Sequence, residues 1–158
     1  MLEHKLIELV HQIKSLAKGK FISTAESCTG GLVSSYLTSI PGSSEYFTTG
    51  IVSYSNEIKI KLLNVNSKTL DKFGSVSEEV AKEMAMGSMK TANSDIAVSV
   101  TGIAGPGGGT KNKPVGMVCF GIATPKEVKS TTHYFSGTRS EIRQKSCEVA
   151  LKLIITSV

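Results

Sequence analysis

The sequence contains no tryptophan and only three cysteines, and none of its apolar runs approaches the ~20 residues that a transmembrane helix needs. The cysteines, Cys28, Cys119 and Cys147, are widely spaced and form no C-x-x-C pair. This spacing favours reduced thiols over a disulfide framework or a zinc site. The first twenty residues are amphipathic rather than continuously apolar, so they do not resemble a signal peptide. We therefore expect a cytoplasmic protein that does not cross a membrane.

Aromatic residues are also few, at 6% of the chain, and the basic residues are dispersed along it. Proteins that bind nucleic acid without sequence preference usually combine a clustered basic face with aromatic side chains for stacking. Nucleic-acid binding is therefore the least favoured function. The net charge of +5 favours an anionic partner, and a small phosphorylated ligand accounts for it as well as DNA does.

The length of 158 residues and an apolar fraction of 40% predict one globular domain over residues 1–158. Thr138, with Glu141 three residues later, has the pattern of a capping box, and Asn56 is the expected N-cap of an earlier helix. Alternating helices and strands predict a three-layer α/β/α sandwich, and two consecutive strands near the end predict a mixed sheet. The helices are expected at 2–17, 32–40, 57–63, 78–91 and 139–154, and the strands at 20–25, 46–54, 95–101, 115–124 and 128–135.

Several familiar catalytic signatures are absent from the chain. A hydrolase elbow would need glycines two residues either side of Ser27, where Ala25 and Thr29 stand instead. No Walker pattern precedes a Lys-Ser or Lys-Thr pair, and the three histidines lack the spacing of metal ligands. We therefore expect no metal site.

The stretch Ala25-Glu-Ser-Cys-Thr-Gly-Gly31 joins a predicted strand directly to a predicted helix. Such a junction leaves backbone N–H groups without intrahelical partners, and these groups can bind an anion or a developing oxyanion. A hydroxyl just before them, on Ser27, is well placed to act as a nucleophile. The alternative is that Ser27 or Thr29 only caps the helix, and local sequence alone favours that interpretation.

A second candidate pair lies about thirty residues further along the chain. Tyr54 ends a predicted strand and Lys59 stands one turn into the next helix, so both can face one cleft. A lysine that is desolvated in a cleft loses proton affinity and can act as a base toward serine. The alternative is a solvated lysine on an amphipathic helix, which the spacing alone favours.

The loop from Gly102 to Pro114 holds five of the fifteen glycines. Closely spaced glycines allow a backbone to approach a phosphate, and successive N–H groups can form an anion-binding nest. A flexible connection explains the glycines equally well. Arg139, in the first turn of the last helix, can hold a phosphate or carboxylate with two hydrogen bonds, unless it is an ordinary surface arginine.

Together these segments resemble the CinA C-terminal-domain family, the nicotinamide-nucleotide amidases. The matching stretches are AESCTGG (25–31), YSNEIK (54–59), GSVSEEV (74–80), SVTGIAGPGGGT with KPVG (99–110 and 113–116), and FSGTRSEIR (135–143). The resemblance covers nearly the whole chain in the same order, and it implies the stand-alone amidase form with a three-layer α/β sandwich.

The resemblance implies hydrolysis of the carboxamide of nicotinamide mononucleotide to nicotinate mononucleotide and ammonia, in pyridine nucleotide salvage. It implies Ser27 as nucleophile, Lys59 and Tyr54 as its activating partners, a homo-oligomer, and no metal or organic cofactor. Thr101 and Arg139 match positions associated with the ligand. The amides of Cys28, Thr29 and Gly30 are candidate oxyanion donors. The 5′-phosphate is expected against either Arg139 or the amides from Gly102 to Gly109, which include Gly105 and Gly108.

Two alternatives remain open from the sequence. The thiol of Cys28, at a helix start that lowers thiol pKa values, is a rival nucleophile to Ser27. The chain can also be a non-catalytic nucleotide-binding module or a competence-associated regulatory module. A pure binding module has no reason to keep Ser27, Tyr54 and Lys59 together, so their geometry is the feature that discriminates between these functions.

Overall fold

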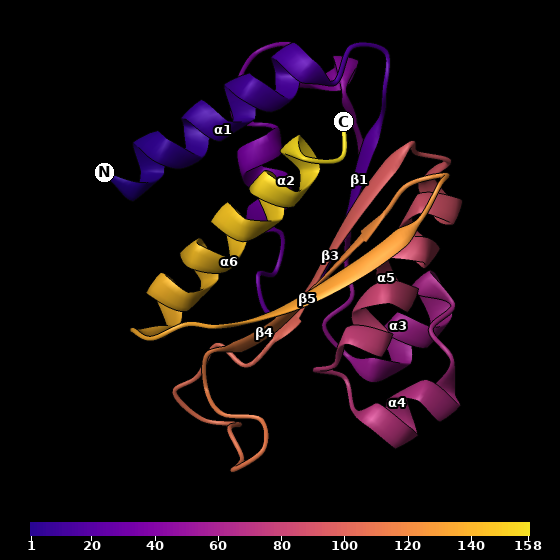
Figure 1. The fold of residues 1–158 in the computed structure, drawn as a ribbon, viewed down its shortest axis with the longest axis vertical. Helices are drawn as coiled ribbons and strands as arrows, with labels where there is room; N and C mark the ends of the chain where they lie inside the picture. Colours follow the sequence, from indigo (N-terminus) through magenta and orange to yellow (C-terminus); the bar gives the residue numbers. More distant parts are fainter.

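A five-stranded sheet of order β2-β1-β3-β4-β5 organises the computed structural model, which describes residues 1–158 (Figure 1). Strands β1, β2 and β3 run parallel, whereas β3-β4 and β4-β5 pair antiparallel. The prediction of a mixed sheet is therefore confirmed. The strands are β1 (Ile22–Glu26), β2 (Phe47–Val52), β3 (Ile96–Gly102), β4 (Met117–Ala123) and β5 (Val128–Tyr134).

Helices cover both faces of this sheet, which confirms the predicted three-layer α/β/α arrangement (Figure 1). Helices α1, α2 and α6 lie on one face, and α3, α4 and α5 lie on the other. None of them is long and apolar enough to span a membrane. Their bounds are α1 (Leu2–Leu16), α2 (Leu32–Leu37), α3 (Asn56–Leu63), α4 (Ser67–Phe73), α5 (Glu78–Ala92) and α6 (Arg139–Ile155), with a short 3-10 turn at Ser43–Glu45.

The main hydrophobic core fills the layer between the sheet and helices α1, α2 and α6. It contains 23 buried residues, among them Val10, Val100 and Ile142. The middle strands β1 and β3 are buried along nearly their whole length, as expected for strands covered on both faces. This burial holds the ends of β1 and β3 rigidly, and the segments that follow those ends carry the candidate site.

The helix ends agree with the sequence at some positions and differ at others. Thr138 and Glu141 form the predicted capping box at the start of α6. The prediction of Asn56 as an N-cap is wrong, because the Ser55 hydroxyl accepts the Ile58 N–H and caps α3. Helix α2 stops at Leu37 instead of reaching Ile40. Helix α4 was not predicted, since its seven residues carry little apolar periodicity.

Candidate active site

The candidate site lies where the parallel strands β1, β2 and β3 end. Because their carboxyl ends meet at one edge of the sheet, the segments that follow them converge, as they do in other open α/β sheets. A cavity of about 440 Å³ opens at this edge. The predicted site residues that line it are Ser27, Cys28, Tyr54, Lys59, Thr101, Gly102, Gly105, Gly108 and Arg139. Thr29 and Gly30 are not among the lining residues.

Ser27 and Lys59 are in direct contact at the base of the cavity. The Lys59 Nζ donates to Ser27 Oγ at 3.0 Å, and both side chains are buried, with 1% of Lys59 exposed. The ammonium also donates to the backbone carbonyls of Ser53, at 2.8 Å, and Tyr54, at 3.4 Å. Both carbonyls belong to the turn just before α3, the helix that carries Lys59. The same segment therefore positions the lysine side chain and holds its amine in place.

Burial lowers the pKa of Lys59 to about 8, because the charged amine has lost most of its contact with water. About a tenth of the amine is therefore neutral at pH 7, far more than for a lysine of ordinary pKa. A neutral amine has two hydrogens and one lone pair. With the hydrogens on the carbonyls of Ser53 and Tyr54, the lone pair is free to accept the Ser27 proton. The geometry suits a general base acting on a serine nucleophile.

The Tyr54 side chain lies on the outer side of the cavity. Its hydroxyl accepts a hydrogen bond from Arg139 Nη2 at 3.1 Å, and the residue is 61% exposed. A proton relay through this hydroxyl, between Ser27 and Lys59, does not match the structure, because those two residues touch directly. Tyr54 instead contributes its carbonyl to Lys59 and its ring and hydroxyl to the mouth of the cavity.

Some backbone N–H groups between β1 and the start of α2 have hydrogen-bond partners, and others have none. The Glu26 carboxylate accepts the N–H groups of Gly31, Val33 and Ser34, so the start of α2 is capped by a side chain of its own chain. This result corrects the expectation that the helix start itself is free to bind an anion. The Gly30 N–H is also occupied, since it donates to the Ser27 carbonyl.

Two backbone donors of this segment remain free. The N–H groups of Cys28 and Thr29 donate no backbone or side-chain hydrogen bond. The Thr29 hydroxyl is the one buried side-chain polar atom in the structure that has no partner. Unpaired buried polar groups are uncommon in folded proteins, so three of them in two adjacent residues need an explanation. Of the three predicted oxyanion donors, Cys28 and Thr29 are available and Gly30 is not.

The Cys28 thiol does not have the properties of a nucleophile. Burial raises its pKa to about 12, against the expectation that the helix start would lower it. The thiol is therefore protonated at physiological pH. Because Glu26 already occupies the amides at the start of α2, that helix end does not stabilise a thiolate.

We expect Cys28→Ala to retain most of the activity of the wild-type protein. The substitution removes only a buried neutral thiol and keeps the backbone N–H. The rate of substrate turnover, measured before and after treatment with iodoacetamide, checks this expectation. Complete loss of activity in Cys28→Ala, with the fold intact by circular dichroism, would make the thiol the nucleophile instead of Ser27.

The glycine-rich loop forms the wall of the cavity opposite Ser27. Arg139 Nη1 donates to the Gly105 carbonyl at 2.7 Å, and Lys113 Nζ donates to the Phe73 carbonyl at the end of α4. The N–H groups of Gly105, Gly107 and Gly108 donate no hydrogen bond. Gly105 has a φ of +78°, and a Cβ there would lie 2.5 Å from the Val115 side chain, so glycine is required.

All charged side chains that line the cavity are basic. Its charged lining residues are Lys59, Lys113 and Arg139, and no Asp or Glu lines it. Together with the free amides of the loop, these cations favour an anionic ligand. Thr101 is less available, because its buried hydroxyl donates to the Ser75 carbonyl at 2.8 Å. No group of three or more His, Cys, Asp or Glu lies close enough together to hold a metal ion.

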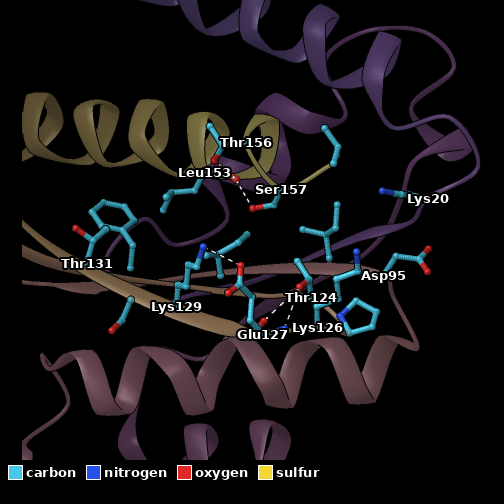
Figure 2. Close-up of a pocket in the computed structure, with 16 residues that line it drawn as sticks. Lys20, Asp95, Thr124, Lys126, Glu127, Lys129, Thr131, Leu153, Thr156 and Ser157 are labelled. Carbon is cyan, nitrogen blue, oxygen red and sulfur yellow. Dashed lines mark hydrogen bonds and ion pairs between the residues drawn. The ribbon is translucent and has the colours of Figure 1, made fainter.

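A larger cavity, of about 710 Å³, lies at the other end of the sheet beside the last turn of α6 (Figure 2). It is lined by apolar residues such as Ile96, Phe120 and Ile122 and by a larger number of polar ones, among which Lys129 pairs with Glu127 at 2.7 Å. The buried serine–lysine contact lies in the smaller cavity. We therefore identify the smaller cavity, and not the larger one, as the candidate active site.

Sequence reasoning missed three residues that shape the site. Glu26 caps α2, Lys113 anchors the glycine-rich loop, and Arg143 binds the backbone after Ser27. All three fall inside the stretches that carry the family resemblance, which is the only signal that could have pointed to them. Their contacts join segments up to 115 residues apart, so local spacing does not predict them.

Comparison with known proteins gives one consistent family. The family described as "CinA C-terminal domain" matches residues 3–158. A CinA-like protein of Endomicrobium trichonymphae is 54% identical over 139 residues, which is 88% of this chain, and one of Fusobacterium nucleatum is 58% identical over 130 residues, which is 82% of this chain. The chain spans about a third of the length of these curated relatives, 32% and 31% respectively.

Solved structures of related proteins match this chain over almost the full length of both chains. The competence/damage inducible protein CihA from Agrobacterium tumefaciens is 41% identical, with a TM-score of 0.93 over 96% of this chain and 94% of that one. A competence or damage-inducible protein from Enterobacter asburiae is 33% identical, with a TM-score of 0.92 over 96% of each chain.

Proposed function

Since this chain belongs to the CinA C-terminal domain family, we propose that it is an amidohydrolase that converts nicotinamide mononucleotide to nicotinate mononucleotide and ammonia. The observation that carries the proposal is the buried contact of 3.0 Å between Ser27 Oγ and Lys59 Nζ. A lysine with its pKa lowered to about 8, aimed at a serine hydroxyl, is the arrangement that activates a serine for attack on an amide.

An amide is a poor electrophile, so its hydrolysis needs a strong nucleophile, a site for the oxyanion and a proton for the leaving nitrogen. In our proposal Ser27 Oγ attacks the carboxamide carbon while neutral Lys59 takes the hydroxyl proton. The N–H groups of Cys28 and Thr29 stabilise the oxyanion of the tetrahedral intermediate. One such donor is typically worth about 100- to 1,000-fold in rate.

Breakdown of the intermediate completes the first half of the reaction. The C–N bond breaks, and Lys59 returns its proton to the nitrogen, which leaves as ammonia. The nicotinoyl group then forms an ester with Ser27. A water molecule, deprotonated by Lys59, attacks this ester through a second oxyanion. As the ester C–O bond breaks, Lys59 returns the proton to Ser27 Oγ, and the product acid loses its own proton to solvent to leave as the carboxylate of nicotinate mononucleotide. Lys59 is neutral again at the end of the cycle, and no other reactant is consumed.

The cations and free amides of the cavity support a phosphorylated substrate. The 5′-phosphate accepts hydrogen bonds from the N–H groups of Gly105, Gly107 and Gly108 in this proposal, with Lys113 and Arg139 adding positive charge. The cavity volume of about 440 Å³ lies within the usual range for sites of small ligands, roughly 300 to 1,000 Å³.

Incubation of the purified protein with nicotinamide mononucleotide tests the proposal. We expect ammonia and nicotinate mononucleotide in equal amounts, measured by a coupled ammonia assay and by chromatography. Free nicotinamide, which lacks both the ribose and the phosphate, serves as the control and is expected to react far more slowly. Binding of the nucleotide without any ammonia release would favour the non-catalytic module instead.

A further inference from the structure

The turn that follows Ser27 is held by an arginine from the other end of the chain. Arg143, in the second turn of α6, donates from Nε to the Cys28 carbonyl at 3.1 Å and from Nη2 to the Thr29 carbonyl at 2.8 Å. A guanidinium group is planar and rigid, so two such bonds fix the orientation of both carbonyls. Arg143 does not line the cavity, and it therefore acts only through this turn.

Main-chain hydrogen bonds hold only part of this turn: the Gly30 N–H donates to the Ser27 carbonyl and the Leu32 N–H to the Thr29 carbonyl, both at 3.1 Å. Thr29 is followed by Gly30, with a φ of +57°, and Gly31, with a φ of +100°. Glycine adopts positive and negative φ values with similar ease, so peptide groups beside it rotate at low cost. The Ser27 N–H is fixed by the Val100 carbonyl, but the Cys28–Thr29 peptide has no main-chain partner.

The carbonyl contacts decide where the free amides point. A trans peptide is planar, with its C=O and N–H pointing in opposite directions, and the one cis bond of this chain lies elsewhere, at Gly105-Pro106. When Arg143 binds the Cys28 carbonyl, it turns the Thr29 N–H away from α6. The Cys28 N–H belongs to the preceding peptide, whose carbonyl is held by the Gly30 N–H.

We propose that Arg143 is a positioning residue for the amidase reaction: by binding the Cys28 carbonyl, it keeps the Thr29 N–H of the same peptide unpaired and directed at the oxyanion, while the bond from the Gly30 N–H to the Ser27 carbonyl orients the Cys28 N–H. The proposal rests on the function proposed above. It explains why unpaired donors persist in a buried turn, since an anchored backbone cannot rotate to find other acceptors. It also assigns different roles to two arginines four residues apart, with Arg139 facing the cavity and Arg143 facing the turn.

Substitution of Arg143 tests this role through the division between kcat and KM. We expect Arg143→Met to lower kcat for nicotinamide mononucleotide about 100-fold, the usual effect of losing one oxyanion donor, and to change KM little. Arg143→Lys keeps the charge but lacks the planar, rigid fork that fixes both carbonyls, so its kcat is expected to be intermediate. Lys145→Met, which removes a half-buried cation of the same helix that binds the Ser136 carbonyl, is the matched control and should leave both constants unchanged.

Two further measurements separate positioning from a general loss of structure. In Arg143→Ala, added ethylguanidinium is expected to restore part of kcat, because it can occupy the vacated position and bind the same carbonyls. A fluorophosphonate probe, which phosphonylates an activated serine with loss of fluoride, should label Ser27 about 100-fold more slowly in Arg143→Met. Intact-protein mass spectrometry measures this rate without any need for the nucleotide substrate.

The outcomes distinguish this proposal from the proposed function. If the wild-type protein is labelled by the probe but releases no ammonia from the nucleotide, the substrate assignment fails, and slower labelling of Arg143→Met still supports positioning. Labelling and kcat at wild-type levels in Arg143→Met would overturn the role of Arg143. If that variant does not fold, Arg143→Lys decides in its place, and wild-type kcat in Arg143→Lys would overturn the proposal.

Discussion

Ser27→Ala is expected to reduce ammonia release from nicotinamide mononucleotide by at least about 1,000-fold, because Ser27 carries the only side-chain hydroxyl that is hydrogen-bonded to Lys59. The neighbouring thiol is protonated, since burial raises the pKa of Cys28 to about 12. The backbone donors of Cys28 and Thr29 remain in the variant, so nucleotide binding should persist. Steady-state ammonia release, together with calorimetric titration of the nucleotide, measures both quantities.

Ser53→Ala provides a matched control for this experiment. Ser53 is buried beside Lys59, but it is the backbone carbonyl that binds the amine, and alanine keeps that carbonyl. Its hydroxyl makes only a long contact of 3.5 Å with the Glu26 carbonyl. Ser53→Ala should therefore keep near wild-type activity. Turnover at the wild-type level in Ser27→Ala would eliminate the proposed mechanism, whatever the control shows.

Much of the fold was predictable because its signals are local. Short runs rich in β-branched and apolar residues predicted all five strands, and the Thr138–Glu141 capping box marks the start of α6. Helix α4 was missed because seven mostly polar residues carry no such period. The cap of α3 was misplaced by one residue, since Ser55 and Asn56 are both good N-caps and only the backbone conformation separates them.

The site was predictable as a set of segments but not as a set of contacts. Spacing alone favoured a solvated Lys59, yet the end of β2 and the turn before α3 bring its amine to Ser27, 32 residues away. The pairing of Tyr54 with Arg139 depends on the packing of α6 against the sheet, across 85 residues. Such contacts are set by tertiary packing, which no local pattern encodes.

The pKa of the Cys28 thiol is a second property that the sequence does not predict, because it depends on tertiary structure. A thiol before a helix usually has a lowered pKa, because free amides stabilise the thiolate. Here the Glu26 carboxylate occupies those amides, and burial then dominates. The sequence contains Glu26 two residues before Cys28, but the direction of its side chain appears only in the folded structure.

Lys59→Met is expected to reduce the turnover of nicotinamide mononucleotide about as severely as Ser27→Ala, because the serine then has no base. Lys59→Arg is the matched variant that keeps a cation but cannot lose its proton near neutral pH, so it should be equally inactive. In the wild-type protein the base must be neutral, and burial lowers the pKa of Lys59 to about 8. The rate should therefore rise about tenfold per pH unit below pH 8 and level off above it.

The same lowered pKa makes Lys59 a cost to stability, which gives an independent test. The unfolded chain binds the lysine proton more strongly than the folded protein does, with pKa values of 10.5 and about 8, so the free energy of unfolding rises with pH between these values. From about pH 7 to about pH 9.5 this contribution amounts to about 2 kcal/mol.

Lys59→Met removes this titration. Urea unfolding at both pH values should show that the difference in free energy of unfolding between the two proteins shifts by this amount in favour of the wild-type protein. A difference that does not change with pH would mean that Lys59 keeps an ordinary pKa and cannot serve as the base. Under the proposed function, Lys59 is required for catalysis and destabilises the fold below its unfolded pKa, which is what a trade-off between activity and stability predicts.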